Sequence, residues 1–264
     1  MVTLGFIGSG NMGGALARAA CKTVEADQVF LANRTVEKAK RLAAELGCQV
    51  ADNLAVAKCA DFIFLGVKPQ MMAQMLQEIS QEFALRDNRF VLVSMAAGLT
   101  IAQIQQMAGG NYPVIRILPN LPVSVGEGIV LYSCSTEVKK TEEELFLKSM
   151  NQAGQFSCIE ENAASSIAGC GPAFAALFVE ALADGGVACG VPRKAAIEYA
   201  AQMLLGTAKL MVEEGTHPAL LKDGVCSPAG STIQGVRTLE KSGFRSAVME
   251  AVISAYEKNQ ALGK

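Results

Sequence analysis

The stretch that decides the fold is Leu4-Gly5-Phe6-Ile7, followed at once by Gly8-Ser9-Gly10-Asn11-Met12-Gly13-Gly14 and then by Ala15-Leu16-Ala17-Arg18-Ala19-Ala20. The apolar run predicts a strand and the alanine-rich segment predicts a helix, so the glycines form the turn between them. Three of them have the G-x-G-x-x-G spacing of a dinucleotide-binding fold. There the first glycine permits a tight turn, the second lets a pyrophosphate approach, and the third lets helix pack on strand. The helix N-terminus would offer N–H groups to the phosphates.

The second expected strand, Gln28-Val29-Phe30-Leu31-Ala32, ends in Asn33-Arg34-Thr35. An NAD-binding fold usually carries an acidic residue here, which binds the ribose 2′-hydroxyl. None is present, and Arg34 with its two polar neighbours would instead hold a 2′-phosphate. The sequence therefore predicts NADPH as cofactor, with NADH possible. The alternative is that Arg34 is a solvated loop charge and that both cofactors bind.

Strand and helix patterns alternate as far as about Ser157, as in a sheet covered by helices. The continuous apolar run Asp61–Val67 is typical of a strand buried on both faces of a parallel sheet. From Glu160 onward only helical patterns follow, with Gly185-Gly186 and Gly190 marking helix ends. The prediction is an α/β fold: a Rossmann-type, doubly wound dinucleotide-binding domain over residues 1–158, then an all-α dimerisation and substrate domain over residues 159–264.

The helical half is rich in alanine and carries few charges between residues 163 and 212. We expect it to bury an apolar face against a second copy, giving a homodimer or a higher oligomer. The alternative is a monomer whose helices cover the sheet.

The composition excludes several classes of function. Of the 264 residues, 51% are hydrophobic, and the net charge is −2 without a basic block, so no nucleic-acid partner is expected. The segment 162–179 lacks the continuous large apolar residues of a membrane span, and no signal peptide is expected before the first strand. Eight scattered cysteines are typical of reduced thiols in a cytoplasmic protein. The single histidine, His217, excludes a metal or catalytic site that needs two.

A second glycine-containing turn opens a helix at Ser227-Pro228-Ala229-Gly230-Ser231-Thr232. The N–H groups of Gly230, Ser231 and Thr232, with two hydroxyls, would suit a carboxylate. The alternative is ordinary helix capping, since Ser, Pro and Gly are common before helices.

This turn, followed by Val236-Arg-Thr-Leu-Glu240 and Gly243-Phe-Arg245, resembles the signature region of the pyrroline-5-carboxylate reductases. Gly169-Cys-Gly-Pro-Ala-Phe174 and Arg116-Ile-Leu-Pro-Asn120 fall in the family's order, and the resemblance covers essentially the whole chain. It implies reduction of Δ1-pyrroline-5-carboxylate to L-proline by hydride transfer from NAD(P)H, the last step of proline biosynthesis.

The resemblance also implies the roles of individual residues. Gly230, Ser231 and Thr232 would bind the substrate carboxylate, where the helical domains of two subunits meet, and the catalytic Thr232 hydroxyl would lie close to the ring nitrogen. The cofactor would be bound by Gly8, Ser9, Gly10, Asn11, Met12, Gly13, Asn33, Arg34, Thr35, Asn53, Val67, Lys68, Pro69, Met95, Ala96 and Ala97. No metal is implied.

Three positions in two motifs depart from the family pattern. Ala229 stands where the family has glycine, which is harmless if its φ angle is negative and strained if it is positive. Ala168 and Cys170 replace two serines, so a catalytic role for side chains at these positions is not expected.

Two other functions fit parts of the chain. A β-hydroxyacid dehydrogenase would share the architecture, but Ala175 and Val179 stand where its Lys and Asn would be. His217 could replace that Lys as the proton-handling group, but His217-Pro218 is typical of the start of a surface helix. A non-catalytic NADP-binding regulatory protein would keep the first turn and would not need Ser231 and Thr232.

Overall fold

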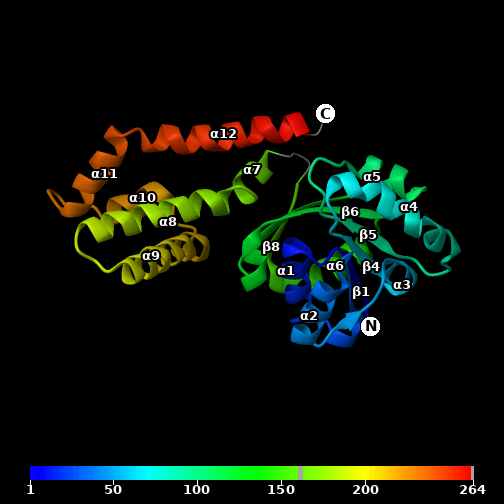
Figure 1. The fold of residues 1–264 in the computed structure, drawn as a ribbon. Helices are drawn as coiled ribbons and strands as arrows, with labels where there is room; N and C mark the ends of the chain where they lie inside the picture. Colours follow the sequence, from blue (N-terminus) through cyan, green and yellow to red (C-terminus); the bar gives the residue numbers. More distant parts are fainter. Residues whose placement is uncertain (160–162, 263–264) are drawn as a thin grey trace. The chain divides into compact units, whose positions relative to one another are not determined.

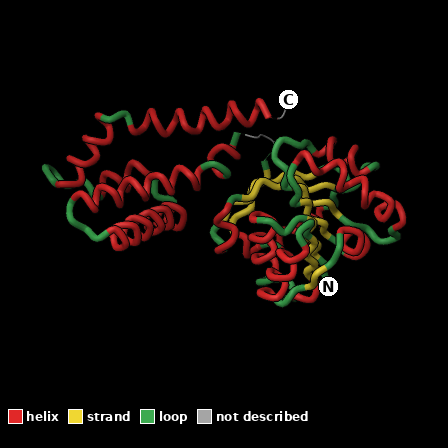
Figure 2. Tube along the Cα trace, in the orientation of Figure 1, coloured by secondary structure: helices red, strands yellow, loops and turns green. Residues whose placement is uncertain are grey.

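The computed structural model describes residues 1–159 and 163–262, which form two compact units (Figure 1). Unit 1 consists of Met1–Cys170 with Tyr256–Lys264, and unit 2 consists of Gly171–Ala255. Strands occur only in unit 1 among the described residues, and unit 2 is helical (Figure 2). The predicted α/β class with a helical C-terminal part is confirmed.

Unit 1 is built on an eight-stranded sheet in the order β3-β2-β1-β4-β5-β6-β7-β8. Its strands are β1 (Leu4–Ile7), β2 (Val29–Ala32), β3 (Gln49–Val50), β4 (Phe62–Leu65), β5 (Val91–Ser94), β6 (Val114–Pro119), β7 (Gly128–Cys134) and β8 (Gly154–Cys158). Strands β1 to β6 are parallel. Because β2 and β4 flank β1, the chain reverses its direction of progress at β1, the switch point where such sheets bind ligands.

Helices connect the strands of unit 1. They are α1 (Asn11–Ala20), α2 (Val36–Leu46), α3 (Asn53–Cys59), α4 (Pro69–Leu85), α5 (Ile101–Ala108), α6 (Lys140–Ser149) and α7 (Ala164–Ala168), with short 3-10 turns η1 (Ala26–Gln28), η2 (Leu121–Val125) and η3 (Asn151–Ala153). Strand β7 runs antiparallel to β6, since only the few residues around η2 separate them. A parallel return would need about a dozen residues or more.

Apolar side chains fill both faces of the sheet because successive residues of a strand point to opposite sides. On one face the rings of Phe6 and Phe64 stack with centroids 4.3 Å apart, and Phe146 of α6 packs beside them. On the other face Ile63 packs with Leu76 of α4. Unit 1 therefore has its own core, with one apolar cluster on each face of the sheet.

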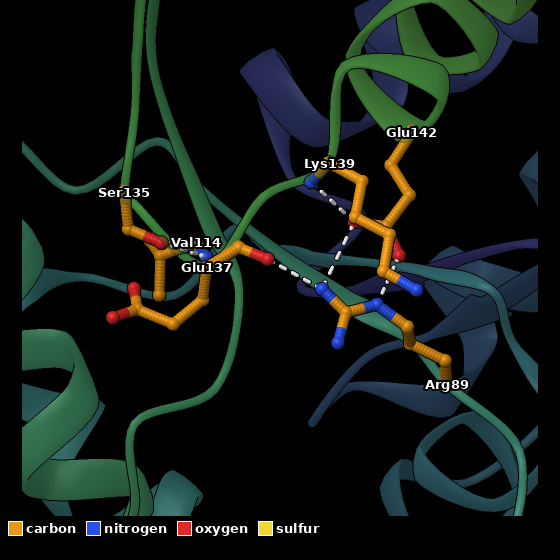
Figure 3. A network of polar contacts seen from close by, with 6 residues as sticks. All are labelled: Arg89, Val114, Ser135, Glu137, Lys139 and Glu142. Atoms are coloured by element: carbon orange, nitrogen blue, oxygen red, sulfur yellow. Dashed lines mark hydrogen bonds and ion pairs between the residues drawn. The ribbon is translucent and has the colours of Figure 1, made fainter.

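A polar cluster links the residue before β5 to the segment between β7 and α6 (Figure 3). Arg89, just before β5, donates to the Glu137 carbonyl and to the Glu142 carboxylate, with an Nη2–Oε2 distance of 3.2 Å. The Ser135 hydroxyl accepts from the Val114 N–H at 3.1 Å. Hydrogen bonds lower the pKa of the Glu137 carboxyl group to about 2. The largest contribution comes from the Ser135 hydroxyl, followed by the backbone, Thr136 and Gln105. This cluster joins strands to α6 and serves the fold.

Unit 2 has almost no apolar core of its own. Its helices are α8 (Gly171–Ala188), α9 (Arg193–Glu214), α10 (Pro218–Gly224), α11 (Ser231–Lys241) and the greater part of α12 (Phe244–Leu262). The buried hydrophobic residues of this described segment are Ala183, Ala196 and Ala200, whereas Leu177 is 65% exposed and Leu205 is 54% exposed. Large apolar side chains therefore face outward.

The prediction that Gly185-Gly186 ends a helix is wrong, because α8 continues to Ala188. A Cβ on Gly186 would lie 3.4 Å from the Ala196 Cβ of α9, so the glycine serves the close packing of α8 and α9. The predicted end at Gly190 is confirmed, because α8 has ended there and Gly190 has a φ angle of +93°.

One stretch, Ala164–Ala188, is long and apolar enough to cross a membrane by length and composition alone. Its most apolar window has a mean hydropathy of 1.6 and is only 11% buried. The expectation that residues 162–179 do not resemble a membrane span rested on large apolar residues. The stretch is apolar because it contains many small residues instead.

Candidate active site

The glycine turn is held between two strands of the sheet. The N–H groups of Gly8 and Ser9 donate to the carbonyl of Ala32, at 2.9 Å and 3.2 Å. Gly8 has a φ angle of +99°, and a Cβ there would lie 2.6 Å from the Gly66 carbonyl group. A Cβ on Gly13 would overlap the carbonyl oxygen of Gly8. Both glycines are therefore required by the approach of backbone to backbone.

Gly10 differs from them, since a Cβ there would meet nothing within 4 Å. Beside it the Ser9 side chain is 6% exposed, and its buried hydroxyl oxygen has no hydrogen-bond partner in the described part of the chain. The amide groups that open α1, at Asn11, Met12 and Gly13, have no acceptor within the helix. Free space, an unpaired hydroxyl and helix N–H groups together fit a pyrophosphate.

A groove of about 660 Å³ leads from this turn along α1 and α2. Ser9, Gly10 and Asn11 line one end, and Lys38 and Arg41 of α2 line its side. Sequence inspection missed these two cations, although their spacing of three residues on a predicted helix places them on one face.

The predicted 2′-phosphate residues follow β2. Asn33 is half-buried, whereas Arg34 and Thr35 are exposed. Thr35 is the N-cap of α2, and its hydroxyl makes no capping bond. None of the three lines the groove.

A second cavity, of about 750 Å³, lies past the carboxyl ends of β5 and β6. Met12, Met95 and Ala97 of the predicted cofactor set line it together. Ala96 is buried and does not line it.

The other predicted cofactor residues lie at helix starts, outside both cavities. Asn53 is the first residue of α3, Lys68 is the N-cap of α4, Pro69 is its first residue, and Val67 precedes them.

Arg116 of β6 also lines the larger cavity, and its role as a lining residue was not predicted. Its Nε donates to the Leu99 carbonyl at 3.0 Å, and burial lowers the pKa of its guanidinium. This role could have been predicted from the sequence, because Arg116 is a charged residue in an otherwise apolar strand. That strand ends at the edge of the sheet where ligands bind.

The second turn, in unit 2, differs from expectation at two points. Ala229 has a φ angle of 59°, so the strained alternative holds. The Gly230 N–H donates to the Ser227 carbonyl at 3.0 Å and is not available to a ligand. This bond, with Pro228 before a residue of positive φ, is the pattern of a type II turn, which favours glycine at position 229.

The start of α11 still offers donors. Gly230 is its N-cap, and no side chain caps it. Ser231 and Thr232 are exposed, and their hydroxyls have no hydrogen bond in the described part of the chain. Amides and hydroxyls at a helix N-terminus suit a carboxylate.

His217 starts a surface helix, as expected. It is the exposed N-cap of α10, and its Nδ1 accepts from the Ala219 N–H at 3.2 Å. All eight cysteines are free thiols. Among the residues that the structure describes, no group of three or more His, Cys, Asp or Glu side chains could hold a metal ion.

Comparison with known proteins extends over the whole chain. Residues 160–262 match the family model for pyrroline-5-carboxylate reductase dimerisation, and residues 3–98 match the model "NADP oxidoreductase coenzyme F420-dependent". The pyrroline-5-carboxylate reductase of Escherichia coli is 36% identical over 99% of this chain and 98% of its own length. The pyrroline-5-carboxylate reductase of Synechocystis is 38% identical over 100% of this chain and 99% of its own length.

A solved structure leads to the same family. The Plasmodium falciparum pyrroline carboxylate reductase with NADP bound is 30% identical in sequence and superposes with a TM-score of 0.87. The match covers 100% of this chain and 98% of that chain. Sequence and fold agree along the full length. The chain belongs to the pyrroline-5-carboxylate reductase family.

Proposed function

We propose that this protein reduces Δ1-pyrroline-5-carboxylate to L-proline, with NAD(P)H as cofactor, as the last step of proline biosynthesis. The observation that carries the proposal is the full-length match to pyrroline-5-carboxylate reductases. The glycine turn supports it, because its free space and unpaired Ser9 hydroxyl fit a dinucleotide.

The reaction needs little acid–base chemistry from the protein. The bound dinucleotide supplies a hydride, and a protonated imine already carries the positive charge that attracts it. The protein must orient the ring, bind its carboxylate and exclude water. We assign the carboxylate to the amides of Ser231 and Thr232, with Gly230 shaping the turn. The Thr232 hydroxyl would position the ring nitrogen and relay to it the proton that makes the imine cationic before the hydride is transferred.

The roles of the cofactor residues are part of the same proposal. Gly8 and Gly13 shape the turn, while Ser9, Gly10, Asn11 and Met12 contact the phosphates. Asn33, Arg34 and Thr35 bind the adenosine end, and Asn53, Val67, Lys68, Pro69, Met95, Ala96 and Ala97 form the remaining wall. We place the boundary between the two functional domains at 158/159, because β8 ends at Cys158 and every described element beyond it is helical.

The protein self-associates, as its match to a dimerisation family indicates. We propose that the exposed apolar side chains of α8 and α9 form the contact between two copies. A small-molecule substrate and a cytoplasmic location are proposed, with neither nucleic acid nor membrane as partner. The apolar stretch Ala164–Ala188 would then be covered by protein rather than by lipid.

The function is tested by incubating the protein with NADPH and Δ1-pyrroline-5-carboxylate and measuring both absorbance at the nicotinamide band and proline formed. Stoichiometric conversion is expected, and a lack of NADPH oxidation would overturn the proposal. Thr232→Ala should lower kcat about 100-fold, as expected for loss of a proton donor, and Thr232→Ser should restore most of it. The same change at Thr207 of α9 is the control. Unchanged kinetics in Thr232→Ala would remove this hydroxyl from the mechanism.

A further inference from the structure

We propose that Cys21 and Cys48 form a reversible disulfide when hydrogen peroxide oxidises the protein. Cys48 is the thiol that reacts first, and Cys21 is the thiol that resolves the product. Both lie in unit 1, and neither lines the two cavities described above. The bond would join the ends of α1 and α2 and would protect Cys48 from irreversible oxidation.

The position of the two cysteines at helix ends is the first argument. Cys21 is the C-cap of α1, and its N–H donates to the Ala17 carbonyl at 3.0 Å. Cys48 follows Gly47, the left-handed C-cap of α2. The Cys48 N–H donates to the Ala43 carbonyl at 3.2 Å. Helix-end hydrogen bonds therefore fix the backbone at both cysteines.

An ion pair brings these two helix ends together. The Arg18 Nη2 donates to the Glu45 Oε2 at 2.9 Å, across 27 residues of sequence. Cys21 follows Arg18 by three residues, so both lie on the face of α1 that meets α2. Cys48 follows Glu45 by three residues as well. The two thiols thus repeat, one step further along both segments, the separation of the ion pair.

The two side chains contact each other in the apolar layer between helices and sheet. A hydrogen bond links the thiols of Cys21 and Cys48. Cys48 belongs to the apolar cluster on one face of the sheet and is 8% exposed, and Cys21 is half-buried and packs against the same cluster. Since the sulfur atoms already face each other, a disulfide needs no distant segment to move.

The hydrogen bond also determines which thiol reacts first. By donating to the Cys48 sulfur, the Cys21 thiol lowers the pKa of Cys48, although burial acts in the opposite direction. The same hydrogen bond, and after it burial, raises the pKa of Cys21. Because the thiolate is the nucleophile, Cys48 attacks the peroxide.

The oxidation proceeds in two steps. The Cys48 thiolate attacks one oxygen of hydrogen peroxide and the O–O bond breaks, which leaves a sulfenic acid on Cys48 and a hydroxide that takes up a proton to become water. The Cys21 sulfur then attacks the sulfenic sulfur, the S–O bond breaks, and the Cys21 proton leaves with the hydroxide as a second water. The two thiols lose two electrons in total, and the peroxide gains them. Cellular thiols reverse the bond by exchange, as with other transient disulfides of reducing compartments.

The disulfide protects the packing of α1. Without a resolving thiol, the sulfenic acid on Cys48 would be oxidised further to sulfinic acid, which cellular thiols do not reduce. A sulfinate carries a charge, and a charge inside the apolar cluster that holds Cys48 is costly. The helix that Cys21 ends is the one that begins at the glycine turn, so damage there would reach the dinucleotide site.

The test compares the unaltered protein with Cys21→Ser, which keeps a donor to Cys48 but cannot form a disulfide. The control is Cys59→Ser, since Cys59 is exposed on α3. After treatment with hydrogen peroxide the remaining thiols are alkylated, and tryptic peptides are identified by mass spectrometry. Lys58 lies between Cys48 and Cys59, so the digest separates these two cysteines.

We expect a linked peptide pair, Cys21 with Cys48, in the unaltered protein and in Cys59→Ser, and dithiothreitol should release it. Cys21→Ser should accumulate sulfinic acid at Cys48 at least about tenfold faster. After peroxide and then dithiothreitol, the unfolding temperature should recover in the unaltered protein and in the control. In Cys21→Ser it should stay lower by at least about 3 °C.

Three results would overturn the inference. Cys21 and Cys48 could remain thiols in the treated protein, or either could link to a different cysteine instead. Sulfinic acid could also form at Cys48 as fast in the unaltered protein as in Cys21→Ser. Equal recovery of the unfolding temperature in all three proteins would exclude the protective role. These measurements need no turnover, so they hold whether or not the protein reduces pyrroline-5-carboxylate.

Discussion

The two compact units differ in where their large apolar side chains lie. Unit 1 places its large side chains inside, and Phe6, Phe64 and Phe146 are at most 1% exposed. Unit 2 leaves large apolar side chains outside, with Leu177 and Leu205 more than half exposed. A sheet flanked by helices on both faces encloses its own core. A few helices with alanines between them do not enclose a core, so another protein surface is needed to cover their apolar outer faces.

Individual glycines show how the local surroundings differ. In unit 1, Gly8 and Gly13 lie where a Cβ would meet backbone, so they cannot change without moving the chain. In unit 2, a Cβ on Gly206 of α9 would meet nothing within 4 Å. Unit 1 is stabilised by contacts inside one chain, and we propose that contacts with a second copy stabilise unit 2.

The largest effect is expected from charging the apolar surface of unit 2. Leu177→Glu/Leu205→Glu should weaken the dimer at least about 1,000-fold, because each buried leucine contributes about 1.5–3 kcal/mol and both copies are altered. Sedimentation at several concentrations measures the dissociation constant. Leu85→Glu is the control, because Leu85 is 76% exposed on unit 1. A double variant that stays dimeric would show that these helices do not form the contact.

The next largest effect separates two glycines of one turn. Gly13→Ala should destabilise unit 1 by about 2–3 kcal/mol, since its Cβ would overlap the Gly8 carbonyl oxygen. Gly10→Ala should leave the unfolding temperature unchanged and weaken NADPH binding at least about tenfold, because its Cβ would fill the space left for the pyrophosphate. Thermal unfolding and NADPH titration measure the two effects. Equal stability losses would contradict the assignment of different roles.

A smaller effect depends on acid. The pKa of Glu137 is lowered to about 2 in the folded protein, from an ordinary value of 4.5. The carboxylate therefore stabilises the fold above about pH 4.5, and this contribution is lost as the pH falls toward 2. Glu137→Gln should lower the unfolding temperature at pH 7, and the difference from the unaltered protein should shrink as the pH falls from 5 to about 2. A constant difference over this range would exclude the carboxylate charge as the cause.

The smallest effect concerns the strained residue of unit 2. Ala229→Gly should raise stability by about 1 kcal/mol, because a positive φ angle of 59° costs alanine more than glycine. Denaturant unfolding measures the gain. Pro228 and the Gly230–Ser227 bond stay in place, so the turn itself should not change. A loss of stability would mean that the Ala229 methyl group makes a favourable contact.

Much of unit 1 could be predicted from the sequence because its signals are local. A short apolar strand, three spaced glycines and a helix former specify the turn at Gly8–Gly13 before any contact is known. His217-Pro218 likewise predicted a surface helix, since proline fits a first helical turn. The antiparallel strand β7 was not foreseen, because the direction of a strand depends on the length of the connection around η2 and on the partner beside it.

The sequence by itself determined the element types, the dinucleotide turn and the family, because these follow from periodicity, glycine spacing and motifs. Only the tertiary structure decided which residues meet. It placed Met12, Met95 and Ala97 in one cavity, brought Lys38 and Arg41 to the groove of the glycine turn, and gave Ala229 a positive φ angle. It also showed that Gly186 serves packing rather than a helix end. Local patterns set the conformation of short segments, but contacts between distant segments depend on how helices and strands pack in space.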